Sequence, residues 1–241
     1  MEWQDDGIVL AARRHGESAA IVHLLTPAHG RHAGLVRGGA GHKARVLFQP
    51  GNLLRVTWRA RLASHLGHFQ VEAKRLVAGR LLTDGNRLAA LGAAAALLDT
   101  GLPERDPHPA LFEAMSELIE ILLEGEAWRE AYVRFELALL AELGFGLDLE
   151  ACAVTGATEG LAFVSPVSGR AVTRAGAGDY APRLLPLPRF LLEDAAADPQ
   201  EISEGLRLTG AFLQRHLFDA TDRELPPARD RLVDRLSREL I

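Results

Sequence analysis

The chain has 241 residues, of which 48% are hydrophobic and 24% charged, so we expect it to fold throughout and to bury a core in one large or a few small domains. No stretch approaches the roughly 18 uncharged apolar residues of a transmembrane helix, which excludes a segment of that kind. The opening residues Met1–Asp6 lack the basic and apolar regions of a signal peptide, and the sequence therefore predicts a cytoplasmic protein.

The net charge of −5 conceals a division of the charges along the chain. Residues 1–76 carry 11 Lys and Arg against 5 Asp and Glu, and they hold seven of the nine histidines. The remaining residues carry 16 Lys and Arg against 27 Asp and Glu. This asymmetry indicates that one module contacts a polyanion, although charge alone does not distinguish such a module from one with solvated basic strands.

Five short apolar runs, separated by turn residues, fill the first 76 residues. They are Gly7–Arg14, Ser18–Thr26, His32–Arg37, Leu54–Arg61 and Gly67–Ala73. In the fourth run the apolar residues alternate with Arg55, Arg59 and Arg61, and a period of two places these arginines opposite the core. Five strands in about 75 residues predict a small barrel, and we expect an OB-fold over residues 1–78.

From about residue 86 the apolar residues recur at helical spacing. Helices are predicted over Arg87–Leu98, Leu111–Leu122, the aromatic-rich stripe from Trp128 to Gly144, the segment from Pro199 to Leu217, and a last segment after Pro227 that runs to Leu240. Asp198 before Pro199 is a strong helix start. The predicted architecture is α+β and multidomain, with a helical bundle over residues 79–241 that contains an irregular insertion with a hairpin over 145–190.

The Gly-rich, basic segment Arg37–Arg45 is the strongest candidate for binding a nucleic acid. Its glycine backbone allows close approach to a phosphate, and Arg37, Lys43 and Arg45 supply charge. It lacks the spacing of a P-loop, and we expect it to form neither helix nor strand. A flexible surface loop with incidental basic residues is the alternative. The predicted nucleic-acid contacts are Arg13, Arg14, Arg31, Arg37, His42, Lys43, Arg45, Arg55, Arg59 and Arg61.

Aromatic side chains are scarce in the predicted barrel, where single strands are usually bound by a positive groove together with stacking rings. Only Trp3, Phe48, Trp58 and Phe69 are present, and Trp58 and Phe69 fall on inward faces. Binding should therefore depend mainly on phosphates, and it should be sensitive to salt. The histidines show no spacing typical of a metal site, and we expect most of them at the surface, where protonation would strengthen binding.

Two pairs of carboxylates leave an enzyme as an alternative. Asp5/Asp6 and Asp219/Asp222 could hold Mg²⁺ in a nuclease or phosphotransferase, but no nucleophile or His lies beside them. The first pair is typical of a solvated turn and the second of a helix exit. The single cysteine, Cys152, forms no intrachain disulfide or Cys-rich zinc site, and we expect it in an irregular loop. We predict no catalytic residue, no metal and no cofactor, and hence a protein that is not an enzyme.

Three strings carry a resemblance to a known family. The segment Arg37–Arg45 leads into Leu47-Phe48-Gln49-Pro50-Gly51, the string Arg134–Phe145 leads into Leu147–Cys152, and Val164–Gly169 follows in the same register. These strings, and the order of the elements over nearly the whole chain, resemble RecO, a family of DNA repair proteins. The second string is the most specific of the three.

The resemblance implies an N-terminal OB-fold, a helical bundle and a small zinc-finger-like insertion. Members that bind zinc carry two Cys-x-x-Cys pairs there. In this chain the first pair reads Cys152-Ala153-Val154-Thr155, and the second is absent around Arg174 to Asp179. We therefore expect a degenerate insertion without metal, held together by the packing of Leu161, Phe163 and Val164.

The resemblance also implies a function and its partners. A RecO protein mediates DNA repair and recombination: it binds single- and double-stranded DNA, anneals complementary strands, and with RecR helps to load RecA onto DNA coated with single-stranded DNA-binding protein. Such a protein is cytoplasmic and associated with the nucleoid. Arg134 is the predicted contact for the acidic C-terminal tail of the single-stranded DNA-binding protein. The alternative is a scaffold whose basic barrel contacts an acidic protein partner.

Overall fold

The computed structural model of this chain describes residues 1–193, 195–219 and 222–238. Its contacts group the residues into two units, Met1–Glu126 and Ala127–Ile241, which are described separately below. Among the described residues, no helix has the length and apolar character needed to cross a membrane. The domain boundary expected after residue 78 and the bounds of the insertion stay predictions.

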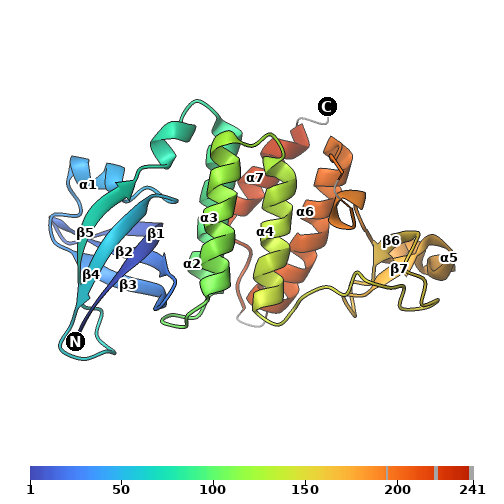
Figure 1. Ribbon diagram of the computed structural model, residues 1–241, viewed down its shortest axis with the longest axis horizontal. Coiled ribbons are helices and arrows are strands. Elements are labelled where there is room, and N and C mark those ends of the chain that lie inside the picture. The colour runs from blue at the N-terminus through green and yellow to red at the C-terminus, as the bar shows by residue number, and fades with distance from the viewer. Residues whose placement is uncertain (194, 220–221, 239–241) are drawn as a thin grey trace. The chain divides into compact units, whose positions relative to one another are not determined.

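Five strands of the first unit close into a barrel in the order β1-β2-β3-β5-β4 (Figure 1). They are β1 (Glu2–His15), β2 (Ala19–Thr26), β3 (Gly30–Val36), β4 (Leu53–Arg59) and β5 (His68–Arg75). Neighbouring strands pair antiparallel, except that β3 meets β5 in parallel at Leu35 and His68. The five strands predicted from alternation are confirmed.

Alternate residues of the strands fill the barrel, as the two-residue period requires. On β4 the apolar positions, Trp58 among them, are buried, whereas Arg55 and Arg59 are exposed. Phe69 of β5 is also buried, which confirms the two aromatic core residues predicted from their faces. A Cβ atom at Gly34 would lie 2.4 Å from the Phe69 ring, so this position on β3 requires glycine.

The expectation that the whole Gly-rich segment is irregular is wrong. A short helix, α1 (His42–Leu47), begins directly after Gly41. The glycines end at that point, and the residues that follow, including Lys43 and Arg45, have good helix propensity. The basic side chains of this segment are therefore held on one helical turn and the residues before it.

Two further expectations for the barrel are wrong. Asp5 and Asp6 lie within β1, where they pair with β4, and not in a solvated turn. Strand β4 ends at Arg59, so Arg61 lies in the following loop and not on the face shared by Arg55 and Arg59.

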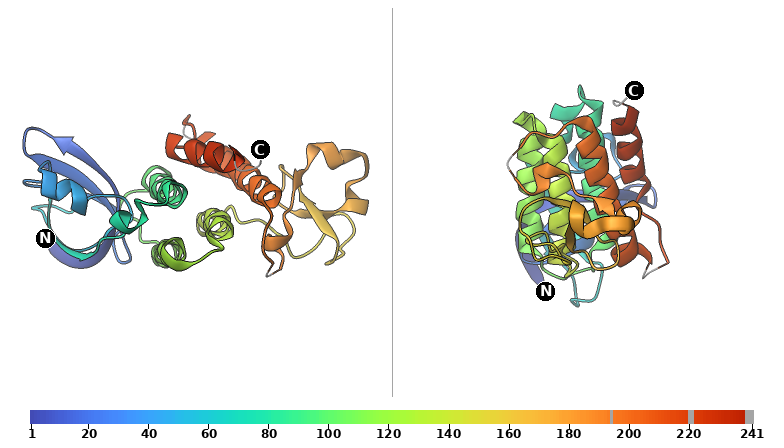
Figure 2. Two further views of the ribbon diagram at one scale, coloured as in Figure 1. Left: turned by 90° about the horizontal axis from the view of Figure 1, so that it is seen from above. Right: turned by 90° about the vertical axis from the view of Figure 1, so that its right-hand side faces the viewer.

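Three helical segments complete the first unit: the 3₁₀ turn η1 (Ala78–Leu81), α2 (Gly85–Gly101) and α3 (Pro109–Glu124). Asp84 caps α2 by accepting two backbone N–H groups of its first turn. Helix α2 packs on β1 and on α3, and α3 also contacts β2; Figure 2 shows both helices beside the barrel, viewed along their axes. The buried Asn52 side chain accepts the N–H groups of Val77 and Ala78 and so fixes the exit from the barrel.

The helices of the second unit are α4 (Trp128–Glu142), α6 (Pro199–Leu213), the π-helical turn η4 (Gln214–Phe218) and α7 (Pro227–Ser237). Helix α6 begins with the predicted cap: Asp198 and Glu201 form a capping box, and Pro199 takes the first position. The aromatic stripe of α4 is buried, as expected of core residues. Leu240, expected in the last helix, lies outside the described residues.

Between α4 and α6 lies the segment predicted to be irregular with a hairpin. It contains β6 (Leu161–Val164), β7 (Ala171–Thr173), α5 (Arg174–Ala177), η2 (Gly178–Arg183), β8 (Leu185–Pro186) and η3 (Arg189–Leu191). The strands form a sheet in the order β7-β6-β8. Leu161 and Phe163 pack against a small core of Cys152, Val172 and Ala177, and the hairpin is confirmed.

Candidate nucleic-acid interface

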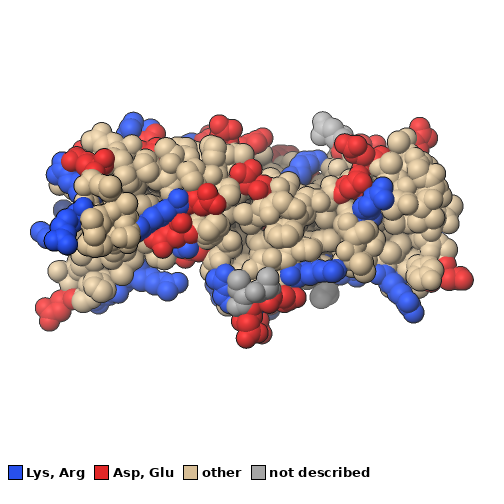
Figure 3. Space-filling model, turned by 90° about the horizontal axis from the view of Figure 1, so that it is seen from below, with Lys and Arg blue, Asp and Glu red and all other residues tan. Residues whose placement is uncertain are grey.

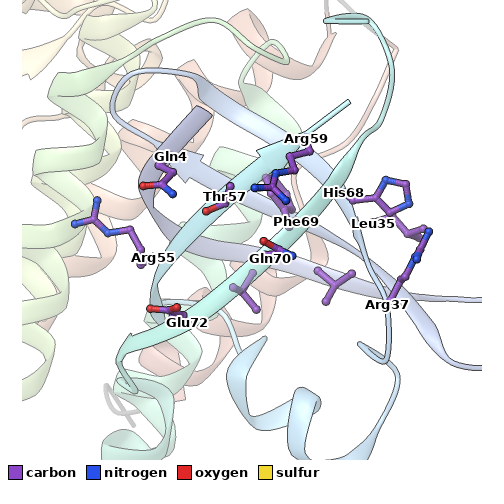
Figure 4. A pocket seen from close by; sticks show the side chains of 12 residues that line it. Gln4, Leu35, Arg37, Arg55, Thr57, Arg59, His68, Phe69, Gln70 and Glu72 are labelled. Atoms are coloured by element: carbon purple, nitrogen blue, oxygen red, sulfur yellow. The ribbon is translucent and has the colours of Figure 1, made fainter. Parts of the chain in front are cut away.

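A groove of about 930 Å³ lies on the outer face of the barrel (Figure 4). It is lined by Gln4, Leu35, Val36, Arg37, Arg55, Thr57, Arg59, His68, Phe69, Gln70, Val71 and Glu72. Neutral polar side chains from β1, β4 and β5 lie along it, and cations stand at its edges. Sequence analysis identified the arginines of this groove but missed Gln4, Thr57 and Gln70, whose shared face appears only once the strands are paired.

The cations of β4 and β5 that face this groove and its surroundings are paired with acids of β1. Arg55 Nε lies 3.0 Å from Asp6, Lys74 Nζ lies 2.7 Å from the same carboxylate, and Arg59 lies 2.8 Å from Glu2. The hydrogen bond from Arg59 lowers the pKa of Glu2, so that carboxyl is charged near neutral pH. Exposed pairs of this kind add little stability, but they neutralise the field that a polyanion would meet.

A second set of cations has no acidic partner among the described residues. Arg37 follows β3, Lys43 and Arg45 lie on α1, and Arg13 lies near the end of β1. Arg14 donates only to the carbonyl of Glu17. Arg13, Arg14 and Arg45 line a smaller groove of about 280 Å³ between the β1–β2 hairpin and α1. The space-filling view shows Lys and Arg side chains over the surface of the protein, some of them beside acidic side chains (Figure 3).

Arg31 differs from the other predicted contacts because it is bound within the first unit. Its Nε donates to the carbonyl of Leu102 at 2.9 Å, and Nη1 lies 3.6 Å from the Asp99 carboxylate of α2. His23 lies 2.5 Å from the same carboxylate. The structure therefore gives Arg31 a role in holding α2 against the barrel.

Most of the histidines in the barrel unit are exposed, as expected, but His32 is buried. His32 is only 4% exposed, and burial, followed by the charge of Arg105, lowers its pKa to about 4. It is therefore neutral near neutral pH. His42, by contrast, is exposed at the start of α1, beside Lys43.

The first carboxylate pair, Asp5 and Asp6, is engaged in contacts within the barrel unit. Asp5 accepts the backbone N–H of Ala28 and lies 3.2 Å from His29, and Asp6 binds Arg55 and Lys74. The described residues contain no group of three or more His, Cys, Asp or Glu side chains placed to hold a metal ion. What the barrel presents is two grooves edged by cations, an arrangement suited to binding an anionic chain.

Comparison with known proteins identifies the family. A family model described as recombination protein O, N terminal, matches residues 1–76, and one described as recombination protein O, C terminal, matches residues 82–224. The chain belongs to the RecO family. The DNA repair protein RecO of Rhodospirillum centenum is 52% identical over 237 residues, which cover 98% of this chain and 94% of that protein. The protein of the same name from Roseobacter denitrificans is 50% identical over the full length of both.

In this RecO chain the single cysteine lies in irregular backbone, as expected, and its side chain is buried in the core of the insertion of the second unit. Its sulfur accepts the backbone N–H of Thr155 at 3.4 Å and that of Thr173 at 3.3 Å. A Cβ atom at Gly176 would lie 3.1 Å from it. Hydrogen bonding by Thr155 and Thr173 lowers the pKa of the Cys152 thiol to about 6, although the residue is only 2% exposed.

Arg134, the predicted partner contact, is exposed on α4 of the same unit. Its Nη2 donates to the carbonyl of Phe190 at 2.7 Å, and the guanidinium lies 5.6 Å from the centre of the Phe190 ring. This arrangement fixes the side chain in place and leaves further N–H groups of the guanidinium available for an anion.

Proposed function

We propose that this chain is a recombination mediator of DNA repair that binds single- and double-stranded DNA and anneals complementary strands. Its membership of the RecO family supports the role in repair and recombination. The observation that carries the binding proposal is the set of barrel cations that have no acidic partner among the described residues.

The DNA follows these unpaired cations in our proposal. They are Arg13, Arg14, Arg37, Lys43 and Arg45, with His42 beside them; Arg61, in the loop after β4, is a further cation without an acidic partner among the described residues. Binding then depends on counterion release, and each phosphate contact on a single strand contributes about 0.7 to the slope of affinity with salt on logarithmic axes. Arg55 and Arg59 contribute less because they are paired, and Arg31 has a structural role.

We infer that the barrel is an OB-fold, a fold that binds single strands in a groove of this kind. The closed five-stranded order and the groove over β1, β4 and β5 support this assignment.

We infer that the insertion is a zinc-finger-like module that no longer binds metal. The positions around the sulfur of Cys152 are held by Thr155, Thr173 and Gly176, which do not supply the four Cys or His ligands of a structural zinc site. These residues do not fit a zinc ion, and apolar packing takes its place.

The partners are also proposals. With RecR, the chain would help to load RecA onto DNA coated with single-stranded DNA-binding protein, and Arg134 would contact the acidic tail of that protein. The held guanidinium of Arg134 supports the last point, because a positioned cation loses little side-chain entropy on binding a carboxylate. The protein would act in the cytoplasm, at the nucleoid, without catalysing a reaction.

Annealing of labelled complementary oligonucleotides, each coated with the single-stranded DNA-binding protein, tests the proposal. We expect faster annealing on addition of this protein, with no nucleotide present. Oligonucleotide length should stay unchanged after long incubation with Mg²⁺. Shortened products would indicate a nuclease. If the protein neither accelerated annealing nor bound DNA at low salt, the proposed function as a recombination mediator would be overturned.

A further inference from the structure

A second cavity, of about 450 Å³, opens at the end of the barrel where β1 begins and β4 ends. We term it the mouth pocket. It is lined by Met1, Glu2, Trp3, Ala28, His29, His32, Trp58, Ala63 and Arg105, all of the first unit. Its volume is in the range of sites that bind small organic groups.

Aromatic rings form one side of the mouth pocket. Trp3 stacks on His29 with ring centres 4.0 Å apart and planes 10° apart, and it stacks on Trp58 at 5.7 Å and 18°. The outer ring, His29, has a side chain that is 30% exposed. Three nearly parallel rings with an exposed end form a platform on which a further flat ring can stack.

The pocket is also lined by a buried imidazole, that of His32, whose nitrogens form no hydrogen bond with the described residues. The His32 ring lies beside the stacked rings of Trp3 and Trp58, which it meets edge to face. Burying an unpaired polar group costs about 1–3 kcal/mol. A neutral imidazole offers one donor and one acceptor, and the edge of a nucleobase offers both kinds of group in return.

The pocket and the groove on the barrel face are lined by consecutive residues of the same strands. Gln4 and Arg59 line the groove, and they directly follow Trp3 and Trp58, whose side chains point to the opposite face of β1 and β4. Arg105 also lines the pocket; it donates to the carbonyls of Ala63 and His65, and its Nε lies 3.8 Å from the Glu104 carboxylate, so its charge is partly neutralised.

We propose that the mouth pocket takes one unstacked base of bound single-stranded DNA, stacked on the exposed ring of His29, which Trp3 supports from behind. This inference rests on the proposed DNA binding and adds base stacking to it. A stacked base adds roughly 1–3 kcal/mol to binding, and it does so with little dependence on sequence. The sequence analysis had counted Trp3 but had assigned it no role.

The test compares an oligothymidylate with an abasic chain of the same length, which keeps the phosphates and removes the bases. The wild-type protein should bind the oligothymidylate at least about fivefold more tightly, the ratio that corresponds to about 1 kcal/mol. Trp3→Leu should abolish this ratio and leave the salt slope unchanged. Trp3→Phe should retain part of it, and His15→Ala, an exposed histidine outside the pocket, should retain all of it.

Three outcomes would overturn the inference. Equal binding of the two chains by the wild-type protein, with a steep salt slope, would remove base stacking and leave the proposed DNA binding intact. A ratio that persists in Trp3→Leu would place the stacking elsewhere. If circular dichroism shows that Trp3→Leu is unfolded, the half-buried His29 is replaced by alanine instead, and an unchanged ratio in His29→Ala would also place the stacking elsewhere. If the wild-type protein bound neither the oligothymidylate nor the abasic oligonucleotide, the result would instead count against the proposed function.

Discussion

Replacement of Arg229 by alanine would leave the carboxylate of Glu136 buried without its cation. In the second unit the Arg229 side chain is 4% exposed and that of Glu136 is fully buried. Arg229 donates from Nε to Glu136 Oε1 at 2.7 Å and from Nη2 to Oε2 at 2.8 Å, so the pair is bidentate and joins α7 to α4. Nη2 also donates to the carbonyl of Leu206 on α6 at 2.7 Å.

The geometry indicates how large the effect should be. Burial acts to lower the pKa of Arg229, but the Glu136 carboxylate outweighs it and raises that pKa above its ordinary value. Removing one member of such a pair costs about 3–5 kcal/mol, because the other charge stays buried and unpaired. That loss is a large part of the 5–15 kcal/mol by which whole domains are typically stable.

Urea unfolding with hydrogen exchange of α4, α6 and α7 as the local probe would measure the loss in the second unit. We expect Arg229→Ala to lower the free energy of unfolding by about 3–5 kcal/mol. Arg229→Ala combined with Glu136→Gln should recover about half of the loss, because the amide carries no charge and can still accept from Thr209. A loss below about 1 kcal/mol in the single variant would refute the reasoning.

Three further predictions concern the first unit. Asp6→Asn removes the carboxylate that pairs with Arg55 and Lys74, so single-stranded DNA should bind more tightly. The salt slope should steepen by roughly 0.7 for each of these cations that then contacts a phosphate, and unchanged binding would contradict this prediction. The pKa of His32 is about 4 in the folded protein and about 6.5 in the unfolded chain, so the unfolded chain takes up a proton first as the pH falls. Up to about 3 kcal/mol of stability should therefore be lost between pH 6.5 and pH 4. His32→Phe should not show this loss. Gly30→Ala should cost at least about 2 kcal/mol in thermal unfolding, since its φ is +61° and a Cβ would lie 1.8 Å from a backbone oxygen, whereas Gly16→Ala, at φ +65° with open space around it, should cost about 1 kcal/mol.

The strands and the long helices of this chain could be predicted because their signals are local. Alternation of apolar and polar residues along β4 defines its buried face, and the capping residues at Asp198 define the start of α6. The same reasoning failed for α1, because the glycines that precede it dominate the composition of a short segment.

The candidate interface depends on pairings that sequence does not contain. That Asp6 and Glu2 neutralise Arg55 and Arg59 follows from the register of β1 against β4, which joins residues about 50 positions apart. Trp3, His29 and His32 likewise lie in one pocket only because the folded barrel brings their side chains together. The number of basic residues in the sequence therefore pointed to the barrel as the DNA-binding module. Only the folded structure shows which of its cations are paired with acids and which are not.

The central claim is that DNA binds to the unpaired cations of the barrel, and two triple variants with the same loss of charge test it directly. One replaces Arg37, Lys43 and Arg45 by alanine, and the other replaces Arg55, Arg59 and Lys74. Fluorescence anisotropy of a labelled single strand over a range of salt concentrations gives the slope for each. If DNA follows the unpaired cations, the first variant should lower the slope by about 2 and the second by less than half as much. Equal losses in the two variants, or a larger loss in the second, would show that DNA does not follow the unpaired cations.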